Sequence, residues 1–293
     1  MPRSLGSRRL PLVLVVLGLL GALSLPACAH LPRGSTHGPL TADSITVGLW
    51  HMDEPTGSDV MDSGPIRLHG SAGVDTRAQF GRFGQGRHFS SSVNSFVLVP
   101  ANPLLYGTSG LTVEAWIYLD GYGTYLDTPI AACWSSSANS QSWMLTVTGT
   151  HENFPPAVAS GDLSALMGQA EVGKLAFVYQ PSAAGAPQAY FSARTVPLSR
   201  WAHVAATFDG QVVRLWVNGT LDAQFASAAK IAESNAALMF GNELDPNELT
   251  RFGGYLRTDA NVDGTPYSAF QGVIDEVRIS SAARKSFPYG FEP

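Results

Sequence analysis

The stretch HVAATFDGQVVRLWVNGTLDAQF, residues 203–225, consists of three short segments separated by two turn dipeptides. The first dipeptide, Asp209-Gly210, lies between HVAATF and QVVRLWV, and the second, Asn218-Gly219, lies between VRLWV and TLDAQF. Both dipeptides favour the positive φ angles of tight hairpin turns. The stretch therefore predicts a three-stranded antiparallel meander.

The segment LTVEAWIYL, from Leu111 to Leu119, alternates with a period of two, as a strand with two distinct faces does. Further strands are expected at FVLVP, SWMLTV, KLAFVYQ, AALMF and GVIDEVRIS, and helical periodicity is nearly absent. The 30 glycines and 19 prolines agree with many short elements joined by tight turns. The sequence therefore predicts an all-β fold. One face of the 111–119 strand would carry Leu111, Val113, Ala115, Ile117 and Leu119, and the other Thr112, Glu114, Trp116 and Tyr118.

Length and composition predict one large globular domain. With 293 residues, of which 45% are hydrophobic and 14% charged, the chain can bury a full core without a partner. No second linker and no fixed-period repeat follows residue 44, so residues 45–290 are expected to form a single antiparallel β-sandwich. The formal net charge of −5, without a stripe of Lys or Arg, excludes nucleic acid as an expected partner.

The N-terminus has the three regions of an export signal. Three arginines precede the apolar run PLVLVVLGLLGALSL (residues 11–25), and small residues follow in PACAH. The run is shorter than the roughly 20 residues that a membrane span needs, so residues 1–28 are predicted to be a removed signal. Residues 29–44, which are rich in Gly, Pro, Ser and Thr, are predicted to be a flexible tether.

Two cleavage modes are open at the end of this signal. Leu25-Pro26-Ala27-Cys28 is similar to the lipobox of bacterial lipoproteins, in which Cys28 becomes the lipidated first residue, although Pro26 departs from the usual small or β-branched residue. Ala27-Cys28-Ala29 is also a site for ordinary signal peptidase, which would leave a periplasmic or secreted protein. We favour the lipoprotein, held at a membrane of the cell envelope by acyl chains alone.

Cys133 is then the only cysteine of the mature domain, and it lies in the apolar run PIAACW. No basic residue adjoins it to favour a thiolate, so it is predicted to be a small buried apolar residue and not a reactive thiol. No cysteine pair and no H-x-x-x-H spacing exist, so neither a disulfide nor a zinc site is expected.

Seven motifs carry a resemblance to a known family. In kind and order they resemble the laminin-G-like domains of the concanavalin A-like lectin/glucanase superfamily, over nearly all of residues 47–285. The resemblance implies a jelly roll of two curved antiparallel sheets, a fold that lectins and some glycanases share. The motifs are WHMDE (50–54), DSG (62–64), FGQGRHF (83–89), LTVEAWIYL (111–119), WAHVAATFDG (201–210), VRLWVNG (213–219) and GVIDEVRIS (272–280).

The stretch GNELDPNE, residues 241–248, has E-x-D-x-x-E spacing, which resembles the catalytic motif of some β-glucanases of this superfamily. In those enzymes one carboxylate is the nucleophile and another the proton donor, and the motif lies on a central strand. Here the strand AALMF is expected to end at Asn242, and Pro-Asn marks a turn. Glu243 and Glu248 are therefore interpreted as part of an acidic insertion, and glycosidase activity is the third interpretation of function.

The same insertion contains D-x-N-x-D-G at Asp259, Asn261 and Asp263, which is the first half of a calcium loop. The Glu expected at loop position twelve is absent, so further ligands would come from elsewhere, such as Asp245 or Glu248. A bound calcium ion and a solvated turn loop are both open interpretations.

Three residues outside the insertion are further candidates. Asp62 and Asp275 are expected to meet if the first and last strands are neighbours, either in a carboxylate or calcium cluster or, preferably for Asp275, in structural hydrogen bonds. Trp134, in the segment CWSSSANSQS, is the first candidate for stacking on a ligand. The other tryptophans of the domain are expected in the core or on a sheet face.

These features predict an exported, lipid-anchored module that binds a glycan or a surface protein and is not an enzyme. A structural module of the cell envelope, used in adhesion without sugar binding, is the second interpretation. The sequence gives no indication of the oligomeric state.

Overall fold

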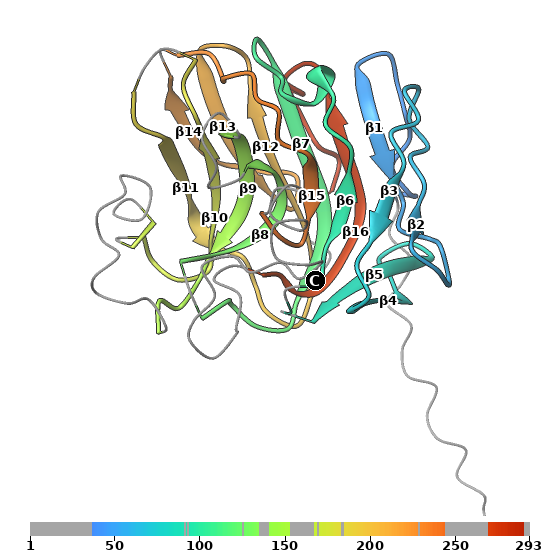
Figure 1. Ribbon diagram of the computed structural model, residues 1–293. Coiled ribbons are helices and arrows are strands. Elements are labelled where there is room, and N and C mark those ends of the chain that lie inside the picture. Colours follow the sequence, from blue (N-terminus) through green and yellow to red (C-terminus); the bar gives the residue numbers. More distant parts are fainter. Residues whose placement is uncertain are drawn as a thin grey trace, which may run out of the picture. The chain divides into compact units, whose positions relative to one another are not determined.

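The predicted meander is confirmed in the computed structural model, where its strands are β12 (Trp201–Phe208), β13 (Val212–Val217) and β14 (Thr220–Ala226) (Figure 1). Asn218 and Gly219 both have a positive φ, 48° and 71°, as a two-residue hairpin turn of this type requires. The turn dipeptide therefore forms the second hairpin as the sequence predicts.

The first hairpin differs in one detail, because only Gly210 has a positive φ, 91°. Residues 209–211 form a three-residue loop, in which Asp209 Oδ1 accepts hydrogen bonds from the backbone amides of Gln211 and Val212 at 3.0 and 2.8 Å. The Asp209 carboxylate thus stabilises this loop by accepting hydrogen bonds from its backbone, whereas the second hairpin uses two residues with positive φ.

The structure describes residues 37–90, 92, 94–124, 126–134, 141–152, 167–168, 170–182, 185–227, 229–243 and 269–289. These residues form two eight-stranded sheets, in which the strand pairings are antiparallel. The described residues also form a short 3-10 helix, η1 (Pro103–Leu105). No helix among these residues is long and apolar enough to cross a membrane.

Sheet A has the order β14-β13-β12-β7-β16-β5-β4, with β1 paired to β16. Its strands besides the meander are β1 (Thr46–Trp50), β4 (Thr76–Phe80), β5 (Gln85–Ser90), β7 (Leu111–Leu119) and β16 (Gln271–Ser280).

Sheet B has the order β11-β10-β9-β8-β15-β6-β3-β2. Its strands are β2 (Asp59–Val60), β3 (Gly70–Ala72), β6 (Val97–Val99), β8 (Asp127–Trp134), β9 (Gln141–Thr148), β10 (Lys174–Tyr179), β11 (Gln188–Thr195) and β15 (Leu238–Phe240). The predicted all-β jelly-roll sandwich is confirmed.

The core lies between the two sheets, and alternate side chains of β7 point into it. Leu111, Val113 and Ile117 are buried in the main apolar cluster, as predicted, together with residues of β8, β9 and β10 from sheet B. Cys133 is a free, fully buried thiol in this cluster, and burial raises its pKa well above the ordinary value. The prediction that Cys133 is a small buried apolar residue is confirmed, and a raised thiol pKa disfavours the thiolate.

Strand β16, the last strand of the described chain, lies in the middle of sheet A. Its residues 271–274 pair with β5, and its residues 277–280 pair with β1 on the same edge. The register against β7 shifts between Asp275 and Arg278, and Glu276 has a positive φ of 54°. This bulge lies where β16 changes partner, and it turns several polar side chains toward the outer surface of sheet A.

Residues 37–44, the second half of the predicted tether, lie against sheet A. Leu40 is only 2% exposed and packs in an apolar cluster with Leu49, Trp116 and Phe287. The described domain therefore begins ahead of residue 45, with an N-terminal segment that packs on the sheet before β1 starts.

Asp62 fixes the corner that follows β1. Its Oδ1 accepts hydrogen bonds from the backbone amides of Leu49 at 2.8 Å and Gly64 at 2.6 Å, and its Oδ2 accepts one from Leu68 at 2.7 Å. The side chain is fully buried. Replacement would leave three amides without their acceptor, which a buried site tolerates poorly.

We expect Asp62→Ala to lower the free energy of unfolding by about 2–5 kcal/mol, because buried amides lose a charged acceptor. Urea denaturation followed by tryptophan fluorescence measures this change. Asp59→Ala, an exposed aspartate three residues away, is the matched control and should have no effect. Equal stability of the two variants would contradict a structural role for Asp62.

Candidate ligand groove on sheet A

The outer face of sheet A, opposite the core, carries aromatic and charged side chains. His203 of β12, Trp116 of β7 and Asp275 of β16 lie side by side across three strands. Arg278 of β16 is the register partner of Glu114, the next outward-facing residue of β7. Segments from both ends of the domain cross this face, and a polar network forms beneath them.

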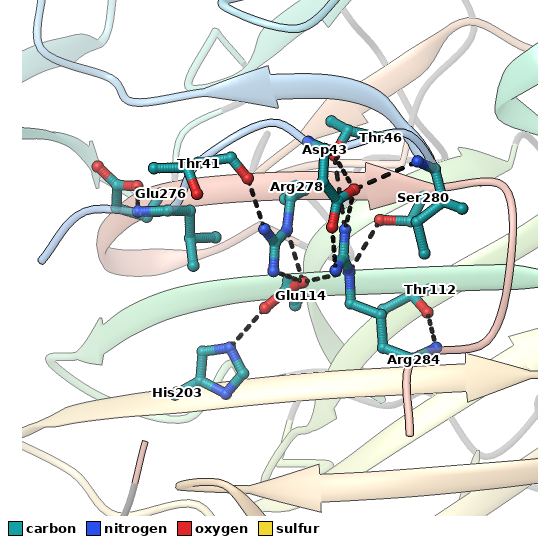
Figure 2. A network of polar contacts seen from close by, with 12 residues as sticks. Thr41, Asp43, Thr46, Thr112, Glu114, His203, Glu276, Arg278, Ser280 and Arg284 are labelled. Carbon is teal, nitrogen blue, oxygen red and sulfur yellow. Dashed lines mark hydrogen bonds and ion pairs between the residues drawn. The ribbon is translucent and has the colours of Figure 1, made fainter. Parts of the chain in front are cut away.

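Glu114 is the centre of this network (Figure 2). Its Oε1 accepts a hydrogen bond from Arg278 Nε at 2.8 Å and lies 3.4 Å from Arg284 Nε, while its Oε2 lies 3.0 Å from His203 Nε2. Figure 2 shows the two guanidinium groups on one side of the carboxylate and the imidazole on the other. A fully buried carboxylate is thus held by two cations and one ring.

The protonation states of this network follow from burial and pairing. Burial alone would raise the pKa of Glu114, but the hydrogen bond with His203 and the charge of Arg278 outweigh it, so the pKa is lowered. Burial lowers the pKa of His203, against the opposing effect of Glu114. His203 is therefore neutral at neutral pH and donates through Nε2 to an ionised Glu114.

The network fastens both ends of the domain to the sheet, in an arrangement that we call the terminal clasp. Arg278 Nη1 donates to the carbonyl of Thr41 at 2.7 Å. Arg284 donates to both carboxylate oxygens of Asp43, at 2.7 and 2.8 Å, and this pairing holds the pKa of Asp43 well below its usual range. The amide of Leu40 donates to Glu276 Oε2 at 2.6 Å.

Beside the clasp lies a groove of about 320 Å³ between the meander and residues 283–285. Its apolar lining comes from Trp216, Leu221 and Ala283. Trp216 is the register partner of Leu221, is 7% exposed and packs edge to face with Phe287, whereas Leu221 is 41% exposed. The volume is at the lower end of the range of small-molecule sites, which are typically apolar with a few polar groups.

The polar lining of the groove consists of Asp209, Arg214, Arg284 and Lys285. Arg214 Nη1 donates to Asp209 Oδ2 at 2.7 Å, and this bond lowers the pKa of Asp209. Arg284 is committed to the terminal clasp and forms one wall. The groove therefore offers apolar contact together with hydrogen-bond donors on two sides.

The structure brings the first and last strands together, as the sequence predicted, since β1 pairs with β16. Asp275 is fully buried and its Oδ2 accepts a hydrogen bond from the amide of Phe83 at 2.9 Å. Glu276 Oε1 lies 2.8 Å from His51 Nδ1, and this hydrogen bond raises the pKa of His51. Asp275 thus has the structural hydrogen bond that the sequence analysis preferred for it.

The side chains of Asp62 and Asp275 both accept hydrogen bonds from backbone amides, and they do not share a site. Within the described ranges, no three His, Cys, Asp or Glu side chains are placed to hold a metal ion together. Asp245, Asp259, Asn261 and Asp263 lie outside the described residues. The calcium interpretation of that insertion stays a prediction.

Trp134 is 4% exposed and packs against Met144, Ala176 and Val178 in a separate apolar cluster of sheet B. Its ring is covered in this structure, so it offers no open face for stacking. Trp50 and Trp143 are fully buried in the main core, as expected.

Glu243 follows β15 and does not lie within it, as predicted. Gly241, with a φ of 75°, turns the chain out of the strand, and the amide of Glu243 bonds to Asn242 Oδ1 at 2.9 Å. Glu248, the other half of the carboxylate pair, lies outside the described residues, as do Cys28 and the signal segment.

Sequence reasoning missed the clasp and the groove. The sequence puts Glu114 on the less apolar face of its strand, and a lone carboxylate among Thr112, Trp116 and Tyr118 is a signal that a cation must meet it. Lys285 and Arg214 carry no comparable signal, because single charged residues in hairpin strands and loops are common on any surface.

The fold and this face define a class: a two-sheet antiparallel jelly roll of the lectin type. A family model described as the concanavalin A-like lectin/glucanases superfamily (Laminin_G_3) matches residues 90–260, which is more than half of the chain. The chain belongs to this family, and the resemblance seen in the sequence is confirmed. No curated protein sequence matches it.

Three solved structures are similar in fold, each over 82% of this chain. The binding domain of Paraclostridial Mosquitocidal Protein 1 has a TM-score of 0.56 and 13% identity, and this chain covers 50% of that chain. Domain 4 of an extracellular arabinanase from Geobacillus stearothermophilus, in complex with arabinotriose, has a TM-score of 0.53 and 16% identity, and this chain covers 93% of that chain. The binding domain of botulinum neurotoxin DC, in complex with SialylT, has a TM-score of 0.53 and 12% identity, and this chain covers 48% of that chain.

Asp275 predicts a pH dependence of stability. Burial, together with the charges of Glu276 and Asp53, raises its pKa to about 8 from 3.8. The folded state therefore holds a proton that the unfolded state has lost, so stability falls as pH rises through this interval, by about 1.4 kcal/mol per pH unit from this group. We expect Asp275→Asn to flatten the curve between pH 5 and 8.

Urea unfolding at intervals of half a pH unit measures this slope, with Asp59→Asn as the exposed control. Above pH 6.5 a shallower decline should remain in Asp275→Asn, because the raised pKa of His51 acts in the same direction, whereas below 6.5 the lowered pKa of His203 acts in the opposite direction. An unchanged slope in Asp275→Asn would show that Asp275 is ionised in the folded protein.

Proposed function

We propose that this protein is an exported glycan-binding module that holds a saccharide in the groove between the meander and residues 283–285. The observation that carries the proposal is the composition of the groove, in which an exposed leucine and a tryptophan lie beside guanidinium and ammonium groups. Sugars present the same two surfaces, since their C–H faces pack on apolar side chains and their hydroxyls bond to polar groups.

The size and position of the groove support this proposal. At about 320 Å³ it suits one or two sugar rings and not a long polymer segment. It lies beside a hairpin and the segment that follows β16, on the outer surface of the sheet, where side chains can vary without disturbing the core. The solved relatives in complex with arabinotriose and SialylT share the fold, which favours a saccharide over other small molecules as the ligand.

We propose a non-catalytic role because a retaining glycosidase needs two carboxyl groups about 5–5.5 Å apart with access to substrate. In the groove itself Asp209 is the only carboxylate among the described lining residues, and it is paired with Arg214. Glycosidase activity through Glu243 and Glu248, and a purely structural envelope module, are the competing interpretations.

The proposal includes export and anchoring. The N-terminal signal with Cys28 would attach acyl chains upstream of the domain, and residues 29–36 would then connect the lipid to the terminal clasp. A module of this kind would present its groove at the cell envelope. Calcium at Asp259, Asn261 and Asp263 is a further proposed component.

We expect the protein to bind a subset of a glycan array and Leu221→Ser to weaken that binding about tenfold, because the sugar loses its apolar contact. Leu104→Ser, at a leucine that is 52% exposed elsewhere, is the matched control and should bind normally. Arrays run with millimolar calcium and with EGTA test the ion, and loss of signal in EGTA would support a calcium requirement.

An array without any bound glycan would favour the structural module. Release of reducing sugar from β-glucans, abolished by Glu243→Gln, would establish the enzyme instead.

Expression of the full chain in bacteria with radioactive palmitate tests the anchor. The protein should be labelled and should fractionate with membranes, whereas Cys28→Ala should be unlabelled. An unlabelled wild-type protein would exclude the lipoprotein and favour cleavage after Ala29.

A further inference from the structure

We propose that the groove selects a sugar that carries a carboxylate at the end of a glycan chain, a specificity that rests on the proposed glycan-binding function. This specificity follows from the charged side chains that line the groove and from the hydrogen-bond donors among them that already have an acceptor in the protein.

Arg284 is fully committed to the protein. Its Nη1 and Nη2 donate to Asp43, its Nε donates to Ser280 Oγ at 3.1 Å, and its side chain is only 14% exposed. It fixes the wall of the groove and contributes a positive potential that Asp43 largely cancels.

Arg214 has donors to spare. It makes one hydrogen bond, from Nη1 to Asp209 Oδ2 at 2.7 Å, and within the described part of the chain its other N–H groups are not engaged. A guanidinium has five N–H donors in a planar fork that matches a carboxylate. Its side chain is 29% exposed, so the unused edge can meet a ligand.

Asp209 does not oppose an anionic ligand strongly, because it is already satisfied. Besides Arg214, the amides of Gln211 and Val212 donate to its Oδ1, and the bond with Arg214 lowers its pKa. The pair of Asp209 and Arg214 therefore has no net charge.

Lys285 is the surplus cation. It is exposed, and among the described residues no carboxylate or carbonyl accepts a bond from it. With the other two cations each paired to an aspartate, the groove carries a net positive charge beside an apolar surface. A carboxylate that bridges Lys285 and the free edge of Arg214, with its sugar ring on Leu221, satisfies all three.

The small volume points to a terminal sugar. A groove of about 320 Å³ has room for one ring with its carboxylate and part of the next ring. The ligand class is thus a glycan ending in a uronic or nonulosonic acid.

The test uses an array of glycans that end in uronic acids or sialic acids, each printed also as its methyl ester, together with neutral glycans. The ester removes the charge and keeps the stereochemistry. Binding should be at least tenfold weaker for the ester than for the acid, and it should weaken as salt is raised.

Four variants complete the test. Lys285→Gln should weaken binding to the acid about tenfold and leave binding to the ester unchanged, whereas Lys285→Arg should retain the preference. Asp209→Asn should tighten binding to the acid, because it removes the remaining negative charge. Lys230→Gln, an exposed lysine outside the groove, is the matched control.

Equal binding of acid and ester, unaffected by Lys285→Gln but weakened by Leu221→Ser, would overturn this specificity and leave glycan binding intact. Binding of neutral glycans alone would do the same. Absence of any bound glycan in all three sets would overturn the proposed function as well.

Discussion

The buried pair of Glu114 and Arg278 is the interaction on which the outer face of sheet A depends. It joins β7 to β16, the strand whose other edge receives β5 and β1 in succession. Because β16 is last in the described chain, the centre of sheet A is completed only when the C-terminal strand is in place. The Coulombic attraction in a buried ion pair is largely offset by the cost of desolvating both charges, so the pair adds little to the free energy of unfolding. Loss of one partner would leave an unpaired buried charge, so the pair mainly determines which strands lie next to each other.

The same carboxylate connects the sheet to the groove. Arg284 lies 3.4 Å from Glu114, is bound twice by Asp43, and lines the groove with its neighbour Lys285. The wall of the groove is therefore positioned by a network that also holds the N-terminal segment. The clasp and the groove therefore share the residue Arg284, and the segment of residues 40–43 is held next to the proposed ligand site.

The sequence was sufficient for the fold because the fold depends on local signals. Asn218-Gly219 determines a hairpin by its own φ preferences, and the alternation in Leu111–Leu119 determines which residues enter the core. The groove could not be predicted in this way, since Arg214 and Lys285 are distant in sequence. They line one groove only because of the strand order in sheet A and the path of the chain after β16. Trp134 shows the reverse error: a polar neighbourhood in sequence suggested exposure, but β8 is a central strand of sheet B and its end is covered.

The residues that line the groove are under different constraints, which bears on how such a site acquires specificity. Arg284 cannot change without breaking the clasp, whereas the side chains of Leu221 and Lys285 are exposed. Arg214 is intermediate, because it closes the Asp209 turn while presenting a free edge. A fixed Arg284, with a more exposed residue beside it and another across the groove, lets the ligand preference change by single substitutions, which is how one jelly roll serves many ligands.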